Sequence, residues 1–167
     1  MSNHRDSFLV NYSPMGDSVL GDVQRRVWGS LLFCHATLTR KFNAELEQRG
    51  HLTLELYDVL LALEDAPDQR MTMSELARRV VFSPSGLTRL VDRLERKGFV
   101  QRIVHPQDRR SYLCALLPQG EQARKETWPC YAALIQEHFA VHMSPDEAAC
   151  MRSVLHRTLG NPQNPLL

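Results

Sequence analysis

The segment 72–116 constrains the fold more than any other, because it holds two helix starts and a hairpin in succession. Residues 72–75, Thr-Met-Ser-Glu, fit the capping box in which a Thr side chain and a Glu side chain cap one helix start. Ser83 and Pro84 give a second start, with Ser at the N-cap and Pro at the first helical position. Gly98 is well placed to end that helix. Two short helices joined by a brief turn make a helix-turn-helix.

A β-hairpin is expected directly after this pair of helices. Phe99–Val104 and Ser111–Leu116 are rich in Val, Ile, Tyr and Leu, the residues that favour strands. His105–Arg110 lies between them and has the character of a charged turn, so the hairpin would carry a basic tip. A helix-turn-helix followed by such a hairpin is a winged helix.

A long helical stripe precedes the winged helix. Its apolar residues recur every three or four positions over about seven turns, which predicts an amphipathic helix ending at Arg49-Gly50. A helix of about 30 residues is long for so small a protein, so we expect a partner chain to cover it. The stripe comprises Leu20, Val23, Val27, Leu31, Cys34, Leu38, Phe42 and Leu46.

Further helices are expected on both sides of the winged segment. Thr53 resembles the N-cap of a short apolar helix. After residues 117–120 the helical pattern returns, and Trp128-Pro129 interrupts it. Residues 144–147, Ser-Pro-Asp-Glu, open a last helix with an apolar face. That face consists of Met151, Val154, Leu155 and Leu159.

These elements predict a mainly α fold with a small β-hairpin, organised in three parts. The winged helix-turn-helix would occupy residues 51–117. N- and C-terminal helices, at 18–50 and 118–160, would flank it and serve dimerisation. Residues 1–17 read as a loose arm and residues 161–167 as a tail, since neither shows hydrophobic periodicity.

Charge is distributed unevenly, although the net charge is only +1. Residues 70–110 contain ten Lys or Arg and four Asp or Glu, a net charge of +6, and the remaining residues sum to −5. A basic middle between acidic ends indicates that the middle meets a polyanion.

Several other classes of protein are disfavoured by the sequence. The longest apolar runs, Trp28–Cys34 and Val59–Leu63, fall far short of the roughly 20 residues that span a bilayer. The N-terminus shows no basic region followed by an apolar core, so we expect a cytoplasmic protein with reduced cysteines. No Gly-rich phosphate loop, G-x-S-x-G elbow, HExxH or CxxC motif is present, so neither an enzyme nor a cofactor is expected.

The pattern of these residues resembles the MarR family of bacterial transcription regulators. The resemblance spans about residues 20–160 and combines the helix-turn-helix, the wing and the long flanking helices. One departure is Leu117-Pro118-Gln119-Gly120, where the family usually has Leu-Thr-x-x-Gly. The matching residues are Leu76-Ala77, the run from Thr88 to Glu95, Gly98, Val100, Arg102 and Asp108-Arg109-Arg110.

The resemblance implies that Pro84–Lys97 is a recognition helix lying in the major groove of DNA. Helical spacing turns Leu87, Leu90, Val91 and Leu94 inward. We then expect base contacts from the outer face and a phosphate at the helix N-terminus. The expected contact residues of this helix are Ser83, Pro84, Ser85, Thr88, Arg89 and Arg93.

The resemblance also implies roles for the wing and for a second copy of the chain. Arg109 and Arg110 would enter the minor groove, and Asp108 would hold the wing arginine in place. Family members are symmetric dimers, which would read an inverted repeat in double-stranded DNA. Repression is the commoner behaviour in the family.

A small aromatic or phenolic ligand is the expected inducer by the same resemblance. Trp28, His35 and Tyr57 would line its pocket, with apolar walls and a few polar tips. The alternative interpretation is that these three residues are ordinary core or dimer contacts.

Three further hypotheses stay open. The first is a thiol-based redox-sensing regulator, because Cys34 lies on the first helix, as the reactive cysteine of peroxide-sensing relatives does. Cys34 is, however, about five residues past the sensor position and on the apolar stripe, where a buried thiol is inert. His138 and His142 have the spacing of metal ligands on one helix face, although two surface histidines explain them equally and no metal is expected. The last alternative is a winged-helix scaffold that does not bind DNA, against which the basic middle segment argues.

Overall fold

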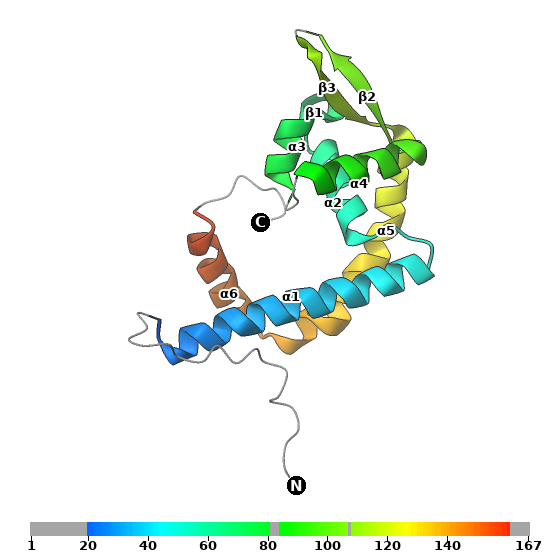
Figure 1. Cartoon of the computed structure of the whole chain (residues 1–167). Helices are drawn as coiled ribbons and strands as arrows, with labels where there is room; N and C mark the ends of the chain where they lie inside the picture. The colour runs from blue at the N-terminus through cyan, green and yellow to red at the C-terminus, as the bar shows by residue number, and fades with distance from the viewer. Residues whose placement is uncertain (1–19, 81–83, 107, 161–167) are drawn as a thin grey trace. The chain divides into compact units, whose positions relative to one another are not determined.

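The computed structural model describes residues 20–80, 84–106 and 108–160. Helices predominate and a small antiparallel sheet accompanies them, which confirms the predicted winged-helix fold class (Figure 1). The chain divides between Lys41 and Phe42, inside the first helix, into two compact units. The elements are α1 (Asp22–Gln48), α2 (Leu54–Glu64), η1 (Pro67–Gln69), β1 (Arg70–Thr72), α3 (Met73–Arg79), α4 (Pro84–Arg96), β2 (Val100–His105), β3 (Asp108–Leu116), α5 (Pro118–His138), η2 (Ala140–His142) and α6 (Pro145–Thr158).

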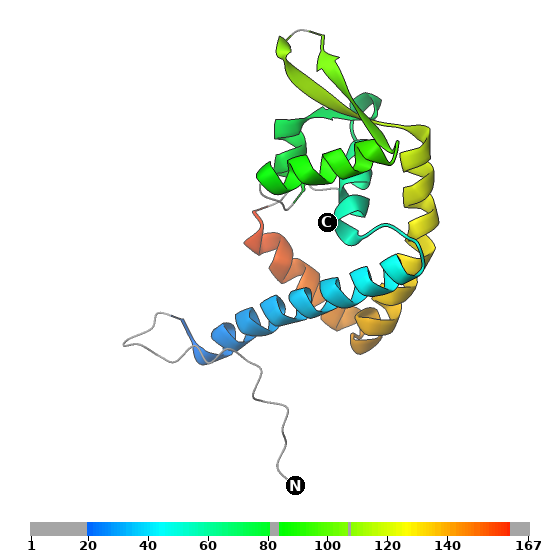
Figure 2. The same ribbon diagram turned by 45° about the vertical axis from the view of Figure 1, so that its right-hand side comes forward.

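The sheet has three antiparallel strands in the order β1-β3-β2. Val100 pairs with Leu116 at the base of the hairpin and His105 pairs with Asp108 at its end. The hairpin extends away from α3 and α4 (Figure 2). Residues 108–110 belong to β3, so the turn is shorter than the expected His105–Arg110. Pairing with β2 extends β3 toward the turn, and the charged composition of residues 108–110 does not reveal that pairing.

Helix α2 lies at the centre of the core, because it contacts α3, α4, α5 and the sheet. Its buried side chains appear on all sides of the helix, which explains why its sequence is so uniformly apolar. Fully buried members of this core include Leu56, Leu60, Leu63, Leu76, Leu87, Val91, Leu94 and Val100.

The starts of α2 and α3 are capped in different ways. At α3 the predicted capping box is confirmed: Thr72 Oγ1 accepts from Glu75 N–H at 3.2 Å, and Glu75 Oε2 accepts from Thr72 N–H at 2.8 Å. At α2, Thr53 is the N-cap residue as predicted, but its side chain makes no capping bond. Asn43 of α1 takes that place, since its Oδ1 accepts from Leu54 N–H at 2.8 Å.

Helix α5 begins at Pro118, so the departure from the family pattern at residues 117–120 leaves the helix intact. Gly120 is required there, because a Cβ would lie 2.3 Å from the carbonyl oxygen of Phe99. Pro129 lies inside the helix, so the expected interruption at Trp128-Pro129 was wrong. Buried Thr127 and Leu134, on either side of the proline, hold the helix to its neighbours.

The part of α1 in the first unit is largely solvent-exposed. Val23 and Val27 are 71% and 61% exposed, and Cys34 is exposed as well, contrary to the burial expected from its place on the stripe. In the second unit Phe42 and Leu46 of the same stripe are buried. No helix in the described ranges is both long and apolar enough to cross a membrane.

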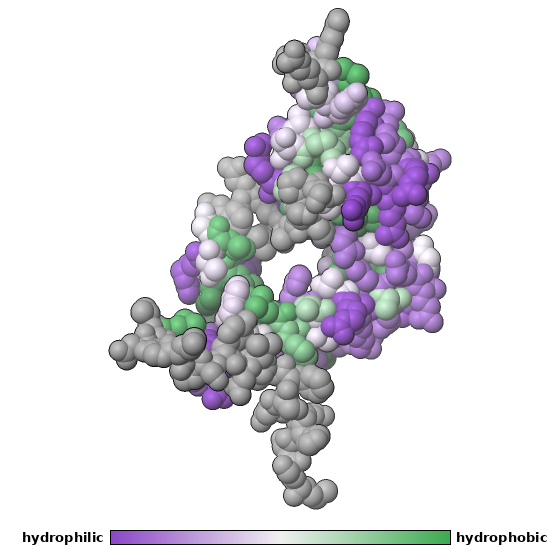
Figure 3. All heavy atoms as spheres, in the orientation of Figure 1, coloured by the Kyte–Doolittle hydropathy of each residue, from purple (hydrophilic) through white to green (hydrophobic). Residues whose placement is uncertain are grey.

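Helix α6 also carries an exposed apolar face. Ser144 and Glu147 form the predicted capping box at its start, and none of its residues is buried. Met151, Val154 and Leu159 are each between 43% and 50% exposed. Apolar surface, green in Figure 3, is visible over α6.

Candidate nucleic-acid interface

Helix α4 presents one face to the core and the other to solvent. Leu87, Val91 and Leu94 are at most 1% exposed and Leu90 is half-buried, as the spacing predicts. Gly98, with φ +71°, ends the turn after α4 in the left-handed conformation that favours glycine. A helix fixed along its apolar face can present its outer side chains in a defined orientation.

The outer face of α4 carries the expected contact residues. Thr88, Arg89 and Arg93 are exposed. Arg93 also forms an ion pair with Glu47 of α1, at 3.7 Å, so its guanidinium is partly neutralised. Hydrophilic surface, purple in Figure 3, covers the region of α4 and the start of α5.

A cluster of charges joins the hairpin to α4. Arg102 of β2 contacts Asp92 Oδ1 and Glu95 Oε2 of α4, each at 2.5 Å. The backbone N–H of Arg102 donates to Glu95 Oε1 at 3.0 Å. Burial alone would lower the pKa of Arg102, but the hydrogen bonds that its guanidinium donates to the two carboxylates raise it, so the side chain stays charged.

This cluster was missed by sequence reasoning. In the sequence, Asp92 and Arg102 stood out only as members of the motif shared with the family. Glu95 and Arg102 lie seven residues apart across the Gly98 turn, and the reversal of the chain there is the one signal that pairs them. The cluster fixes the base of the wing relative to α4.

The remaining predicted contacts lie outside the described part of the chain. Ser83 is one of them, and so are the side chains of Pro84, Ser85, Asp108, Arg109 and Arg110. Their backbone positions, Ser83 excepted, are at the start of α4 and at the start of β3. These two sites are the helix N-terminus and the wing, as the sequence predicts.

Known proteins match this arrangement. Residues 51–111 match the model of the MarR family. The HTH-type transcriptional repressor YetL of Bacillus subtilis is 32% identical over 96 residues, which are 55% of this chain and 57% of YetL. The crystal structure of AbsC, a MarR family transcriptional regulator from Streptomyces coelicolor, is 26% identical with a TM-score of 0.71, covering 86% of this chain and 93% of AbsC. That of Sco3205, another MarR family regulator from the same organism, in complex with DNA, is 22% identical with a TM-score of 0.78, covering 93% and 95% of the two chains.

The chain resembles regulators of the MarR family over most of its length, and its residues 51–111 match the family model. It is a DNA-binding transcriptional regulator with a winged helix-turn-helix. The matched residues 51–111 include the basic segment 70–110 found in the sequence.

The three residues expected around an aromatic ligand differ in exposure. Trp28 is 53% exposed and His35 is also exposed within the first unit, whereas Tyr57 is only 2% exposed in the second. The Tyr57 hydroxyl accepts a hydrogen bond from Arg124 at 3.3 Å, and its ring packs against Trp128. Tyr57 is thus part of the packing between α2 and α5.

The histidines considered as metal ligands do not share a helix face. Helix α5 ends at His138, and His142 lies in the 3-10 turn η2, so that expectation was wrong. His138 Nε2 lies 3.8 Å from Glu45 and its ring packs beside Phe42. Among the described residues no group of three or more His, Cys, Asp or Glu side chains is placed to hold a metal ion.

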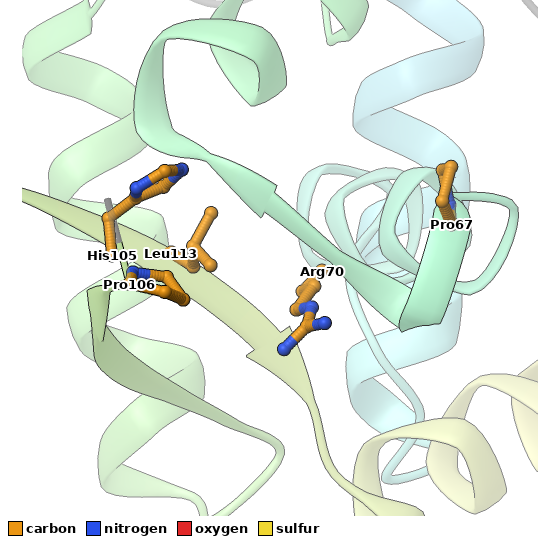
Figure 4. A pocket seen from close by; sticks show the side chains of 5 residues that line it. All are labelled: Pro67, Arg70, His105, Pro106 and Leu113. Carbon is orange, nitrogen blue, oxygen red and sulfur yellow. The ribbon is translucent and has the colours of Figure 1, made fainter. Parts of the chain in front are cut away.

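An open pocket of about 260 Å³ lies beside the sheet (Figure 4). Arg70 of β1 and His105 of the hairpin flank it, and Leu113 forms its floor between them. Arg70 forms an ion pair with Asp68 at 2.7 Å, so the positive charge of Arg70 is neutralised by its neighbour. The pocket therefore offers an apolar recess next to the wing of this regulator rather than a site of concentrated charge.

Proposed function

We propose that this MarR-family regulator binds an inverted repeat in double-stranded DNA as a homodimer and represses the adjacent promoter. The observation that carries the proposal is the exposed row Thr88, Arg89 and Arg93 on α4, whose opposite face is buried. Early residues of such a helix approach base edges, and an arginine can grip guanine through two hydrogen bonds. Arg109 and Arg110 of the wing would enter the minor groove, supported by Asp108.

The DNA-binding arm of the proposal is tested with the DNA upstream of the protein's own gene. We expect tight binding that weakens steeply with salt, because phosphate contacts release counterions. Arg89→Ala should weaken specific binding by about tenfold or more, as the loss of a guanine contact of about 1–3 kcal/mol implies. Arg110→Ala should weaken binding and lower the salt slope by about 1.

A matched control variant distinguishes the loss of a DNA contact from the loss of positive charge anywhere on the protein. Lys125→Ala removes one exposed cation of α5, paired there with Glu121, and should leave DNA affinity unchanged. Binding of wild-type protein no tighter than to random DNA, and equal in all variants, would refute the proposed function. A winged-helix scaffold would then be the better interpretation.

Dimerisation is supported by apolar surface that a lone chain leaves in water. Val23, Val27 and Leu31 on α1 and Met151 and Val154 on α6 are each at least 42% exposed. Residues 18–50 and 118–160 are the proposed dimerisation helices. Light scattering should give twice the chain mass of 19.2 kDa, and Val27→Asp should shift the value toward one chain mass. A wild-type protein that stays monomeric at micromolar concentration would contradict this arm.

Release by a small aromatic or phenolic ligand is the regulatory arm of the proposal. Trp28 and His35 support it, because they leave an indole ring and an imidazole accessible on α1. A panel of phenols should raise the melting temperature and release DNA, and Trp28→Ala should abolish both effects. If no compound shifts melting or DNA binding, this arm fails while the DNA-binding arm stands.

A further inference from the structure

The β2–β3 hairpin turns one of its two faces toward the recognition helix α4. Val100 pairs with Leu116 in the register of the strands, and Arg102 pairs with Cys114. Cross-strand partners share a face of the sheet, as do residues two positions apart along a strand. Val100, Leu116 and Cys114 are buried in the core, and Arg102 forms its two ion pairs with α4. These four residues therefore lie on the face of the hairpin that is next to α4.

Two exposed side chains continue this face toward the end of the hairpin. Val104 pairs with Tyr112, and each lies two positions beyond a member of the pair Arg102 and Cys114. Val104 is 55% exposed and Tyr112 is 51% exposed, so the core leaves about half of each side chain uncovered. The outer half of this face thus presents an apolar surface that carries a phenolic hydroxyl group.

The pair of Val104 and Tyr112 lies on a continuous strip of surface that begins on α4. Thr88 and Asp92 are four residues apart, so they are neighbours on the outer face of the helix. Asp92 contacts Arg102, and Val104 follows Arg102 on the same face of β2. The strip therefore runs from the outer side of the recognition helix to the outer half of the wing.

The geometry of B-DNA decides what lies over this strip. A single sugar–phosphate strand separates the major groove from the neighbouring minor groove. The proposed function places α4 in the major groove and the tip of the wing in the minor groove, so the surface between them must cross that strand. In this chain the surface between α4 and the tip is the strip that contains Val104 and Tyr112.

The chemistry of the two side chains fits a sugar–phosphate strand. A tyrosine hydroxyl is one of the donors that bind phosphate oxygens in protein–DNA complexes. A hydrogen bond to an ionised acceptor is also about twice as strong as a bond between neutral groups. The methyl groups of Val104 can pack against the C–H groups of a deoxyribose, and they carry no donor or acceptor that would need a partner there.

We infer that the Tyr112 hydroxyl donates a hydrogen bond to a phosphate of the strand between the two grooves, and that Val104 packs against the adjoining deoxyribose. The inference rests on the proposed function, because it takes α4 and the wing tip to lie in neighbouring grooves. The contact positions the wing on the duplex without reading its sequence. Because the hydroxyl is neutral, the contact adds nothing to the salt dependence of binding, which comes from cations that replace counterions.

Removing the hydroxyl tests the hydrogen bond. Affinities of the full-length protein are measured by fluorescence anisotropy for the DNA upstream of its own gene and for a random duplex of equal length. Tyr112→Phe should weaken both about tenfold, as for loss of a hydrogen bond to a charged group, and should leave the salt slope unchanged. Unchanged affinity in Tyr112→Phe overturns the inference. A loss confined to the upstream DNA overturns it as well, because such a loss indicates contact with a base.

Adding a cation tests the position of the strip. Val104→Lys places a positive charge opposite the phosphates, so it should tighten binding to both duplexes and steepen the salt slope by about 1. Gln101→Lys is the matched control, because Gln101 is exposed on the opposite face of the same strand. Equal gains in the two variants would indicate general attraction by charge and overturn the placement of DNA over this face.

Failure of the inference is distinguishable from failure of the proposed function. All three variants should keep the melting temperature of the wild type, because the replaced side chains are exposed. If wild type prefers its upstream DNA and Tyr112→Phe binds it equally well, the inference fails and the proposed function stands. If wild type prefers no sequence, but Tyr112→Phe weakens and Val104→Lys tightens binding to every duplex, the backbone contact stands and the proposed recognition of an operator fails.

Discussion

Replacing Arg102 by methionine should disconnect the wing from the recognition helix. The substitution keeps a long flexible side chain but removes the guanidinium that contacts Asp92 and Glu95. The backbone bond from residue 102 to Glu95 remains, so the hairpin itself can still form. Asp92 and Glu95 would be left as like charges three residues apart on one helix, which repel each other.

The magnitude follows from the exposure of the three side chains. Arg102 is 24% exposed, and Asp92 and Glu95 are 48% and 38% exposed, so the ion pairs lie between the surface and buried cases. Exposed pairs contribute up to about 1 kcal/mol, and hydrogen bonds to charged groups about 1.5–3 kcal/mol. With partial solvent screening of both pairs, Arg102→Met should lower the free energy of unfolding by about 2 kcal/mol.

Urea unfolding and DNA binding would be measured on the same variants. Arg70→Met is the matched control, because Arg70 makes one exposed ion pair at the other edge of the sheet and its loss should cost less than about 1 kcal/mol. In a double-mutant cycle, Glu95→Gln should cost stability in wild type but be neutral or stabilising in the Arg102→Met background, because there it only removes the repulsion between Glu95 and Asp92. Operator affinity should fall with Arg102→Met, because wing and helix no longer hold one orientation. Equal stability of the Arg102→Met and Arg70→Met variants would refute the reasoning.

Three further substitutions test other parts of the fold. Burial raises the pKa of Asp58 to about 6 from 3.8, so ionisation costs native stability as pH rises through that window. Asp58→Asn should therefore raise the melting temperature at pH 7.5 and have no effect near pH 4; equal effects at both pH values would contradict this. Gly120→Ala should destabilise the protein by at least about 1 kcal/mol in urea, because its Cβ would strike the Phe99 carbonyl; a neutral result would contradict the close approach. Arg124→Met should cost about 3 kcal/mol by leaving the largely buried Glu64 carboxylate unpaired, and recovery of stability in the Arg124→Met, Glu64→Gln double variant would confirm that origin.

Local signals in the sequence predicted the elements well. The boxes at Thr72 and Ser144 work through residues three positions apart, so a short window of sequence contains every group involved. The inward face of α4 follows from helical periodicity for the same reason. The residues on the outer face were also predictable, because periodicity fixes both faces at once.

Local sequence patterns did not predict the contacts between segments that are distant in the sequence. Asn43 replaces the side chain of Thr53 as the cap of α2 only because the end of α1 packs beside it. The pairing of Arg102 with Asp92 depends on the way the hairpin folds back on α4. Pro129 leaves α5 unbroken because the helix is held by buried neighbours, and tertiary packing outweighs local preference there.

The recognition helix is held unequally at its two sides, by the cluster around Arg102 on one and by the ion pair of Arg93 on the other. The ion pairs of Arg102 are short and its side chain is largely shielded from solvent, so breaking them costs more free energy than breaking an exposed pair. The ion pair between Arg93 and Glu47 is 3.7 Å long and about half exposed on both sides, a geometry worth less than about 1 kcal/mol. Loss of the Arg93 ion pair should therefore leave the wing in place. Glu47→Gln should change the free energy of unfolding in urea by less than about 1 kcal/mol, and a cost equal to that of Arg102→Met would contradict this difference between the two sides of the helix.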